Sequence, residues 1–269
     1  MKTLKNHIIL YDNECPVCDL YTSAFVKAGM LEKEGRTAYT DANTIFTTTN
    51  IDRAKACDEI ALVDTKTGAV SYGVDSLVKI LGNGFPRLNM LFKSRLVTAL
   101  ARKLYFFISY NRKVIVPGRN VENACRPSFN LNYRVAYLLF TWLVTSVILT
   151  HYVAHLQPLI PPTNFYREFV ICGGQIVFQG IIMFIIDRKN AFEYLGNMMT
   201  ISFAGGLLLS LALAFSSVVT APVFFLTWFT MVVIVMFIEH CRRMTVVQLP
   251  WIMSFSWIIY RIIVLAVLL

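Results

Sequence analysis

The sequence predicts an α/β domain at the N-terminus, followed by an all-α transmembrane domain of about five helices. Hydrophobic residues make up 56% of the 269 residues, which is too apolar for a soluble domain. The apolar residues are unevenly distributed: residues 1–86 contain nine Lys/Arg and eleven Asp/Glu, whereas only six Lys/Arg follow residue 134. Between these regions, residues 87–134 hold ten Lys/Arg and one acid, Glu122. The expected parts are therefore a soluble domain at 1–86, a basic segment at 87–132 and a membrane domain at 133–269.

The soluble domain opens with an apolar run and two cysteines. His7–Tyr11 is predicted to be a strand buried on both faces, and a helix is expected from about Pro16 to Leu31. Cys15 and Cys18 lie where strand passes into helix, which is typical of thioredoxin-like redox sites. Unpaired N–H groups and the helix dipole at this cap favour a thiolate on Cys15. Cys18, one turn further on, can attack a mixed disulfide on Cys15, and Pro16 suits the first helical position.

The remaining elements of the soluble domain complete a thioredoxin-like order, β-α-β-(α)-β-β-α. The turn Thr65–Gly68 predicts a β-hairpin, and Gly82 and Gly84 are expected to end the last helix. The expected strands are residues 36–40, 60–64 and 69–72, and the expected helices begin within 41–50 and at about 74.

Several of these residues also resemble a known family. The DCC family of predicted thiol-disulfide oxidoreductases is named for an Asp-x-x-Cys-x-x-Cys motif, which Asp12, Cys15 and Cys18 match. The resemblance covers roughly residues 6–128 and implies a thioredoxin-like fold and thiol-disulfide exchange; Asn13 departs from it, because the family usually has Gly there. The supporting residues it implies are Tyr11, Asn13, Pro16, the segment Tyr72–Ser76, Tyr105, Asn111, Arg112 and the stretch from Gly118 through Cys125 to Pro127.

Other roles remain open for these residues. Cys15 and Cys18 form a redox dithiol, a structural pair or half of a metal site, and the domain has no second close Cys/His pair, so we expect no metal and no cofactor. Asp12 either tunes proton transfer from Cys18 or caps the helix. Cys57 is expected to be a small buried hydrophobe. Cys125 is either a secondary resolving or sensing thiol or a structural residue.

The basic segment is predicted to contain an amphipathic helix. Apolar residues recur at helical spacing over residues 88–110 between basic ones. Such a helix either lies on an anionic membrane surface or closes the soluble domain. No nucleic-acid motif with interleaved aromatic residues accompanies the charge, so we expect the lipid bilayer and no nucleic acid as partner.

The membrane domain is expected to span the bilayer five times. Basic residues mark the 87–132 segment, Arg188-Lys189 and Arg242-Arg243, which all fall on one side if there are five spans. The first ten residues lack the apolar core of a signal peptide, so the positive-inside rule predicts a cytoplasmic N-terminal domain, the inner membrane and an external C-terminus. The expected spans are Tyr133–Leu156, Phe169–Ile186, Gly196–Ser217, Ala221–Cys241 and Leu249–Leu269.

Polar residues within these spans are functional candidates. Arg261 lies near mid-bilayer and must face a partner, a cavity or another subunit. Gln175 and Gln179 are one turn apart and are expected to be hydrogen-bonding neighbours. His151 and His155 share a helix face, which indicates either a metal or quinone site or histidines facing headgroup water.

Further expectations concern the ends and packing of the spans. Glu239 and His240 are expected to be solvated at the inner surface. Gly205-Gly206 would permit close helix packing. Cys172 and Cys241 lie at different depths, which excludes a disulfide between them.

These features predict a membrane-anchored thiol-disulfide oxidoreductase whose cytoplasmic dithiol, Cys15 and Cys18, acts on a protein or small thiol partner. The alternative is a non-enzymatic accessory or redox-sensing subunit of a larger membrane complex. A third alternative is a transporter or quinone-binding body that the dithiol regulates.

Overall fold

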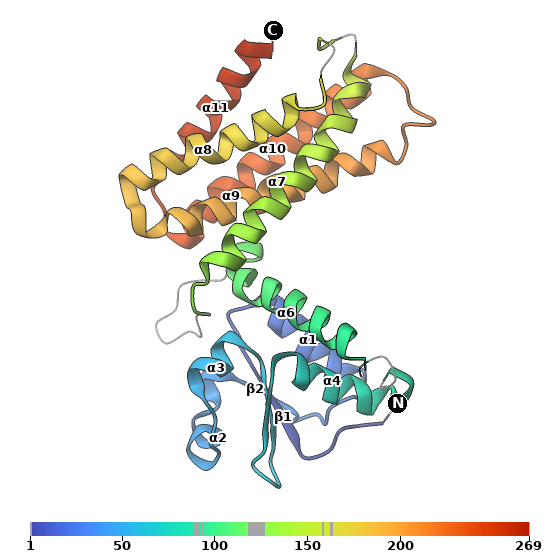
Figure 1. The fold of residues 1–269 in the computed structure, drawn as a ribbon, viewed down its shortest axis with the longest axis vertical. Helices are drawn as coiled ribbons and strands as arrows, with labels where there is room; N and C mark the ends of the chain where they lie inside the picture. The colour runs from blue at the N-terminus through green and yellow to red at the C-terminus, as the bar shows by residue number, and fades with distance from the viewer. Residues whose placement is uncertain are drawn as a thin grey trace. The chain divides into compact units, whose positions relative to one another are not determined.

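The chain folds into two compact units, residues 1–133 and 134–269 (Figure 1). The computed structural model describes residues 2–88, 92, 94–117, 127–157, 159–161 and 164–268. The first unit holds a four-stranded mixed sheet with helices, and the second is helical. An α/β domain followed by a helical bundle is therefore confirmed.

The sheet is built around β1 (His7–Tyr11), the strand predicted from the apolar run. The strand order is β2-β1-β3-β4, in which β1 pairs in parallel with β2 (Arg36–Ala38) and antiparallel with β3 (Ala61–Asp64). β3 continues through a tight turn into β4 (Val70–Tyr72), which confirms the predicted hairpin. Since β1 has neighbours on both edges, it is a central strand.

Both faces of the sheet are covered, as the continuous apolar run of β1 requires. Successive strand residues point to opposite faces, so Ile9 and Leu10 enter different cores. The Ile9 face packs against α1 (Pro16–Lys27), α4 (Gly73–Gly84) and α6 (Arg95–Ile115). The Leu10 face packs against residues of η1 (Tyr39–Asp41), α2 (Asn43–Thr48) and α3 (Arg53–Asp58), and η2 (Pro86–Leu88) follows α4.

Of two predicted helix ends, the first is wrong, and the second lies at Gly84, one of the two glycines expected there. α1 ends at Lys27, not near Leu31, because Gly29 adopts φ +68°, a left-handed conformation that closes the helix. α4 continues through Gly82 to Gly84. Gly84 packs against Met30, where a Cβ would lie 3.3 Å from the Met30 Cγ, so its small size serves packing.

Helix α6 shows features of both predicted alternatives for the basic segment. One face closes the first unit: the Tyr105 hydroxyl accepts a hydrogen bond from the Ile60 N–H at 2.8 Å, and Arg102 pairs with Asp75. Another face is exposed within the described residues of this unit. We call it the α6 stripe; it comprises Leu96, Leu100, Leu104 and Ile108.

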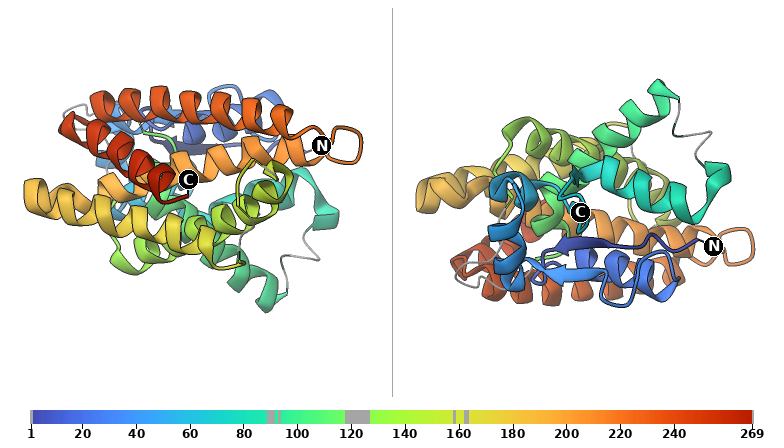
Figure 2. Two further views of the ribbon diagram at one scale, coloured as in Figure 1. Left: turned by 90° about the horizontal axis from the view of Figure 1, so that it is seen from above. Right: turned by 90° about the horizontal axis from the view of Figure 1, so that it is seen from below.

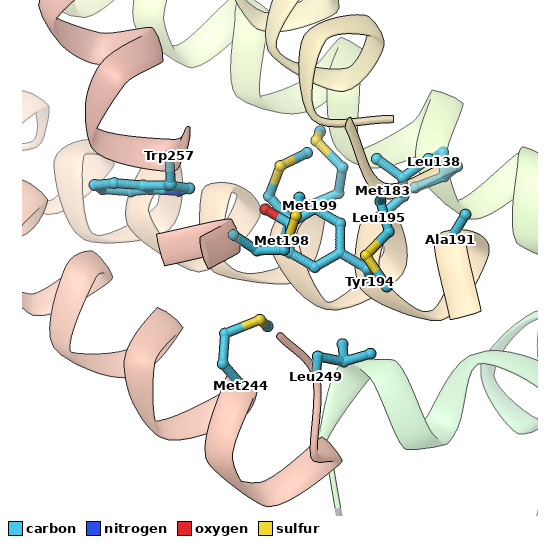
Figure 3. Packing of buried hydrophobic residues seen from close by; sticks show 11 residues of the cluster. Leu138, Met183, Ala191, Tyr194, Leu195, Met198, Met199, Met244, Leu249 and Trp257 are labelled. Atoms are coloured by element: carbon cyan, nitrogen blue, oxygen red, sulfur yellow. The ribbon is translucent and has the colours of Figure 1, made fainter. Parts of the chain in front are cut away.

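In the described part of the second unit, five helices surround a methionine-rich core. Figure 3 shows Tyr194, Met198 and Met199 of one helix packed among residues of its neighbours, including Met183, Met244 and Trp257. The helices are α7 (Leu131–Val153), α8 (Arg167–Asp187), α9 (Ala191–Leu213), α10 (Pro222–Val247) and α11 (Ile252–Leu268), with short turns η3 (Ala154–Leu156) and η4 (Arg188–Asn190).

The predicted count of five spans is not borne out. Among the described residues, three stretches are long and apolar enough to cross a membrane: Leu131–Leu156, Arg167–Leu213 and Pro222–Val247. The single 47-residue stretch Arg167–Leu213 contains the second expected span and all but the last four residues of the third. The fifth corresponds to α11, which has 17 residues where about 20 are needed.

The 47-residue stretch is not one straight helix. The Tyr194 hydroxyl of α9 donates to the Gln179 Oε1 of α8 at 2.8 Å, so the chain reverses at η4 and the two helices lie side by side. Arg243, at the end of α10, donates to the Asn197 Oδ1 near the start of α9 at 3.1 Å. α11 lies against α8 and α10 (Figure 2).

Several expectations for the polar membrane residues need correction. Gln175 and Gln179 do not bond to each other: Gln179 accepts from Tyr194 and from the Ser256 hydroxyl at 2.9 Å. His240 is 0% exposed, not solvated, because its ring packs on Trp257 and meets Tyr194.

The two histidines of α7 and η3 do not converge. The His151 ring bonds to the Val147 carbonyl at 2.8 Å and is exposed, whereas the His155 ring stacks on Phe225. No cluster of metal-ligating side chains occurs among the described residues. Gly205 allows close packing of α9 on α10, because a Cβ there would overlap the Met236 sulfur.

Candidate active site in the N-terminal unit

Cys15 occupies the N-cap of α1, as the strand-to-helix junction predicts. Its backbone is extended, with φ −101° and ψ 105°, and Pro16 takes the first helical position. The Cys15 Sγ accepts a hydrogen bond from the Cys18 N–H at 3.4 Å. The two cysteines are thus joined across one helical turn, with the sulfur of Cys15 at the unpaired N–H end of the helix.

The environment separates the acidities of the two thiols. Hydrogen bonding from the Cys18 side chain, the largest effect, lowers the pKa of Cys15 to about 6 against the opposing effect of burial. The Cys18 N–H and the charge of Arg112 also lower the Cys15 pKa, and the Asp12 charge raises it. The same hydrogen bond and burial raise the pKa of Cys18. At neutral pH, Cys15 is therefore the thiolate and Cys18 the thiol.

Arg112 of α6 supplies the positive charge of the site. Its guanidinium is buried and donates to the Asp12 Oδ2 at 3.2 Å and to the Cys57 carbonyl at 2.8 Å. Burial alone would lower the pKa of Arg112, but the electrostatic effects of the neighbouring Cys18, Asp12 and Cys15 raise it above its ordinary value. A residue about 100 positions along the chain from the dithiol is thus part of its electrostatic environment.

Asp12 links the dithiol loop to Arg112. Its Oδ1 accepts the Glu14 N–H at 3.1 Å, and its backbone carbonyl accepts the Cys15 N–H at 3.1 Å. These bonds fix the turn that leads into α1, while Oδ2 holds the guanidinium. The carboxylate thus organises the turn and positions Arg112.

Both thiols are free but buried. Cys15 is 4% exposed and Cys18 is 7% exposed. No metal-ligating cluster surrounds them among the described residues. A disulfide partner therefore reaches Cys15 only when the residues around it move.

The structure brings together some of the remaining predicted residues and separates others. Asn111 is buried and donates to the Phe107 and Tyr133 carbonyls at 2.8 and 3.0 Å, so it holds the end of α6. The Tyr11 ring lies under the Arg36 guanidinium, and Asn13 is exposed. Among the described residues, no hydrogen bond or ion pair joins either side chain to Arg112.

Sequence reasoning missed Tyr21 and Ser109. Tyr21 lies one turn after Cys18 on α1, where burial is the largest effect that raises the pKa of its phenol. Ser109 lies one turn before Arg112 on α6, and its hydroxyl accepts a hydrogen bond from the guanidinium at 3.5 Å. The helical spacing to a predicted site residue was the available signal in both cases.

The expectation for Cys57 is wrong. Cys57 of α3 is disulfide-bonded instead of being a free buried thiol. Its carbonyl accepts from Arg112, so this disulfide adjoins the dithiol site through the arginine. Cys125, with the rest of residues 118–126, lies outside the described residues. Cys172 and Cys241 are both free thiols, in keeping with the predicted absence of a bond between them.

Comparisons with models of known protein families, with curated proteins and with solved structures found no match to this chain. The interpretation of the site therefore depends on its own residues and geometry.

Proposed function

We propose that this protein is a membrane-anchored thiol-disulfide oxidoreductase with a thioredoxin-like first unit of the DCC type. The observation that carries the proposal is the cap position of Cys15, whose sulfur accepts the Cys18 N–H at 3.4 Å and whose pKa is lowered to about 6. A thiolate at neutral pH is the nucleophile of disulfide exchange, and its neighbour is a protonated thiol one turn away.

The first step is attack by the Cys15 thiolate on a disulfide of the partner. A bond forms between the Cys15 sulfur and one partner sulfur as the partner's S–S bond breaks. The other partner sulfur leaves as a thiolate and takes a proton from water. The charge of Arg112, held by Asp12, favours the thiolate before attack.

The second step is attack by Cys18. Once Cys15 is in a mixed disulfide, it no longer carries the charge that holds the proton on Cys18. Cys18 loses its proton to solvent and attacks the Cys15 sulfur, which releases the partner's second thiolate. The partner disulfide has gained two electrons, and a Cys15–Cys18 disulfide has formed. A thiol reductant restores the dithiol by the reverse exchange.

We assign Asp12 a positioning role. Both carboxylate oxygens are engaged, because one accepts from the Glu14 N–H and the other accepts from Arg112. Replacement by Asn keeps the shape of the turn while removing the charge that holds the guanidinium.

The test is reduction of an aromatic disulfide, 5,5′-dithiobis(2-nitrobenzoate), by the prereduced full-length protein in mild detergent. The wild type should release two thiolates for each Cys15–Cys18 pair oxidised. Cys15→Ser should lose this reaction, and Cys18→Ser should stop at a mixed disulfide on Cys15. The matched control is Cys172→Ser, which removes a free buried thiol of the second unit. Equal release by wild type and Cys15→Ser would refute the proposal.

For the membrane orientation we propose a cytoplasmic first unit. Support comes from the basic segment before α7, from Arg188 and Lys189 in η4, and from the Arg243–Asn197 bond that joins the end of α10 to the start of α9. The disulfide of Cys57 argues the other way, since disulfides are rare in the cytoplasm. A cysteine introduced at Lys66, in the exposed hairpin turn, distinguishes a cytoplasmic first unit from an external one. Intact cells are treated with an impermeant maleimide: protection of this cysteine supports the proposal, and labelling overturns it.

A second candidate is an accessory or redox-sensing subunit of a membrane complex. The observation that favours it is the α6 stripe, an exposed apolar row on a helix whose other face is packed. Purification in mild detergent distinguishes the subunit role from the enzyme role. Other subunits that co-purify in stoichiometric amounts with the wild type, but not with Leu100→Glu, favour the subunit role. A chain that purifies alone and reduces disulfides favours the enzyme.

A further inference from the structure

The second unit contains a cavity at the point where its five helices meet. Its volume is about 80 Å³, enough for several water-sized groups. Most of its lining is apolar. The polar residues that line it are Thr145 of α7, Cys172 and Gln175 of α8, Ser202 of α9 and Arg261 of α11.

Three of these polar side chains have atoms without partners. Gln175 is 8% exposed and its Nε2 bonds to nothing among the described residues; the same holds for the Thr145 Oγ1, on a residue 4% exposed. The Nη1 of Arg261 is also buried and unpartnered there. Each such group is destabilising when it is left unbonded away from water. All three can donate, so a ligand that brings hydrogen-bond acceptors into the cavity would satisfy them.

The charge of Arg261 is likewise uncompensated. None of the described acidic side chains forms an ion pair with it. Its guanidinium instead lies over the Trp257 ring, 3.2 Å from the ring centroid. An unpaired cation within a bilayer is costly and marks a binding or transport site by default. The cavity therefore favours a group that brings one negative charge.

A second, apolar groove meets the cavity at Arg261. Its volume is about 330 Å³, and it runs between α10 and α11, which Figure 2 shows side by side. Apart from Arg261, every lining residue is apolar: Val233, Ile234, Phe237, Trp257, Ile258, Ile262 and Leu265. Arg261 and Val233 line both spaces, so a molecule with its charged end in the cavity can extend an apolar chain along the groove.

We propose that the second unit binds a long-chain monocarboxylate. Its carboxylate accepts hydrogen bonds from Arg261, Gln175 and Thr145, and its hydrocarbon chain lies in the groove between α10 and α11. A planar carboxylate matches the fork of a guanidinium and supplies the single charge that Arg261 lacks. A neutral carbonyl, as in a quinone, would leave that charge unbalanced. The proposal is independent of the dithiol chemistry of the first unit.

The test is equilibrium binding of tritiated palmitate to the full-length protein in phosphatidylcholine nanodiscs. We expect saturable binding by the wild type. Arg261→Gln should weaken it by about 10- to 100-fold, the value of a hydrogen bond to a charged group. The matched control is Arg188→Gln, which removes an exposed arginine of η4 that does not line the cavity and should leave binding unchanged.

Two further arms keep the proposal falsifiable if Arg261→Gln fails to fold. Gln175→Leu removes a cavity donor, and Leu265→Trp narrows the groove; both should weaken palmitate binding. Lack of saturable binding by the wild type, or undiminished binding by Gln175→Leu and Leu265→Trp, would overturn the proposal. So would equal competition by the neutral alcohol hexadecanol, or tighter displacement by a quinone or a lysophosphatidate of the same chain length.

Discussion

Arg112 in the first unit and Arg261 in the second hold a cation away from water in different ways. The Arg112 guanidinium is met by the Asp12 carboxylate and the Cys57 carbonyl. The Arg261 guanidinium lies over Trp257, and its Nη1 has no partner among the described residues. A compensated cation of the first kind tunes its neighbours, whereas an uncompensated cation of the second kind favours a ligand. The two sites therefore predict different consequences when the arginine is lost.

The largest expected effect is on disulfide exchange in the first unit. Cys15→Ser removes the nucleophile and should lower the exchange rate by at least about 100-fold, since a hydroxyl at neutral pH is almost entirely protonated. The rate is measured with prereduced protein and an aromatic disulfide. Cys241→Ser, which removes a free thiol of α10, is the control and should retain the wild-type rate.

Loss of Arg112 should destabilise the first unit, whereas loss of Arg261 should not destabilise the second. Arg112→Met leaves Asp12 buried and unpaired, and should destabilise the first unit by about 3–5 kcal/mol. Hydrogen–deuterium exchange of peptides containing β1 measures this change.

Arg261→Met leaves no buried acid behind among the described residues, so the same measurement on α8 peptides should show no loss of protection. Equal destabilisation of the two units by the two substitutions would break the comparison between them.

The cysteines of the first unit should differ in their labelling. Cys15 and Cys18 are free and Cys57 is disulfide-bonded, so iodoacetamide should modify Cys57 only after reduction. Peptide mass spectrometry before and after reductant measures the difference. Modification of Cys57 in unreduced protein would contradict the presence of a disulfide next to Arg112.

The smallest effect should come from an exposed ion pair of the same unit. The Arg102 and Asp75 side chains are 52% and 58% exposed and pair at 2.8 Å. Exposed pairs of this kind contribute little to stability, because solvent screens their charges. Asp75→Asn should therefore change protection of the β1 peptides far less than Arg112→Met does, and a change of similar size would contradict the account of the buried pair.

The features that could be predicted from the sequence are those that a local pattern of residues determines. The apolar run His7–Tyr11 gave the central strand, and Cys15 and Cys18 were placed at a helix start because strand passes into helix there. Arg112 was predicted as a site residue only from the family resemblance, because no local pattern indicates that a side chain of α6 pairs with Asp12. The helix end at Gly29 could have been predicted from glycine itself.

The membrane region was less predictable from sequence. Hydropathy identified the apolar stretches, but by length and composition α8 and α9 fall in one continuous stretch, and the 17-residue α11 is too short to count as a span, so three candidate spans stand where five were expected. The burial of His240 and the separate surroundings of Gln175 and Gln179 depend on which helices become neighbours. That arrangement comes from tertiary packing around Tyr194 and Trp257, which spacing along one helix does not encode.

The most direct measurement is the pH dependence of Cys15 alkylation in the full-length protein. Iodoacetamide reacts with the thiolate, so its rate with Cys15, followed by peptide mass spectrometry, should rise with a midpoint near pH 6. Cys18→Ala, which removes the largest cause of the shift, should move the midpoint upward more than Arg112→Lys does. A wild-type midpoint near that of a free thiol, about 8.5, would contradict the assignment of Cys15 as the attacking group.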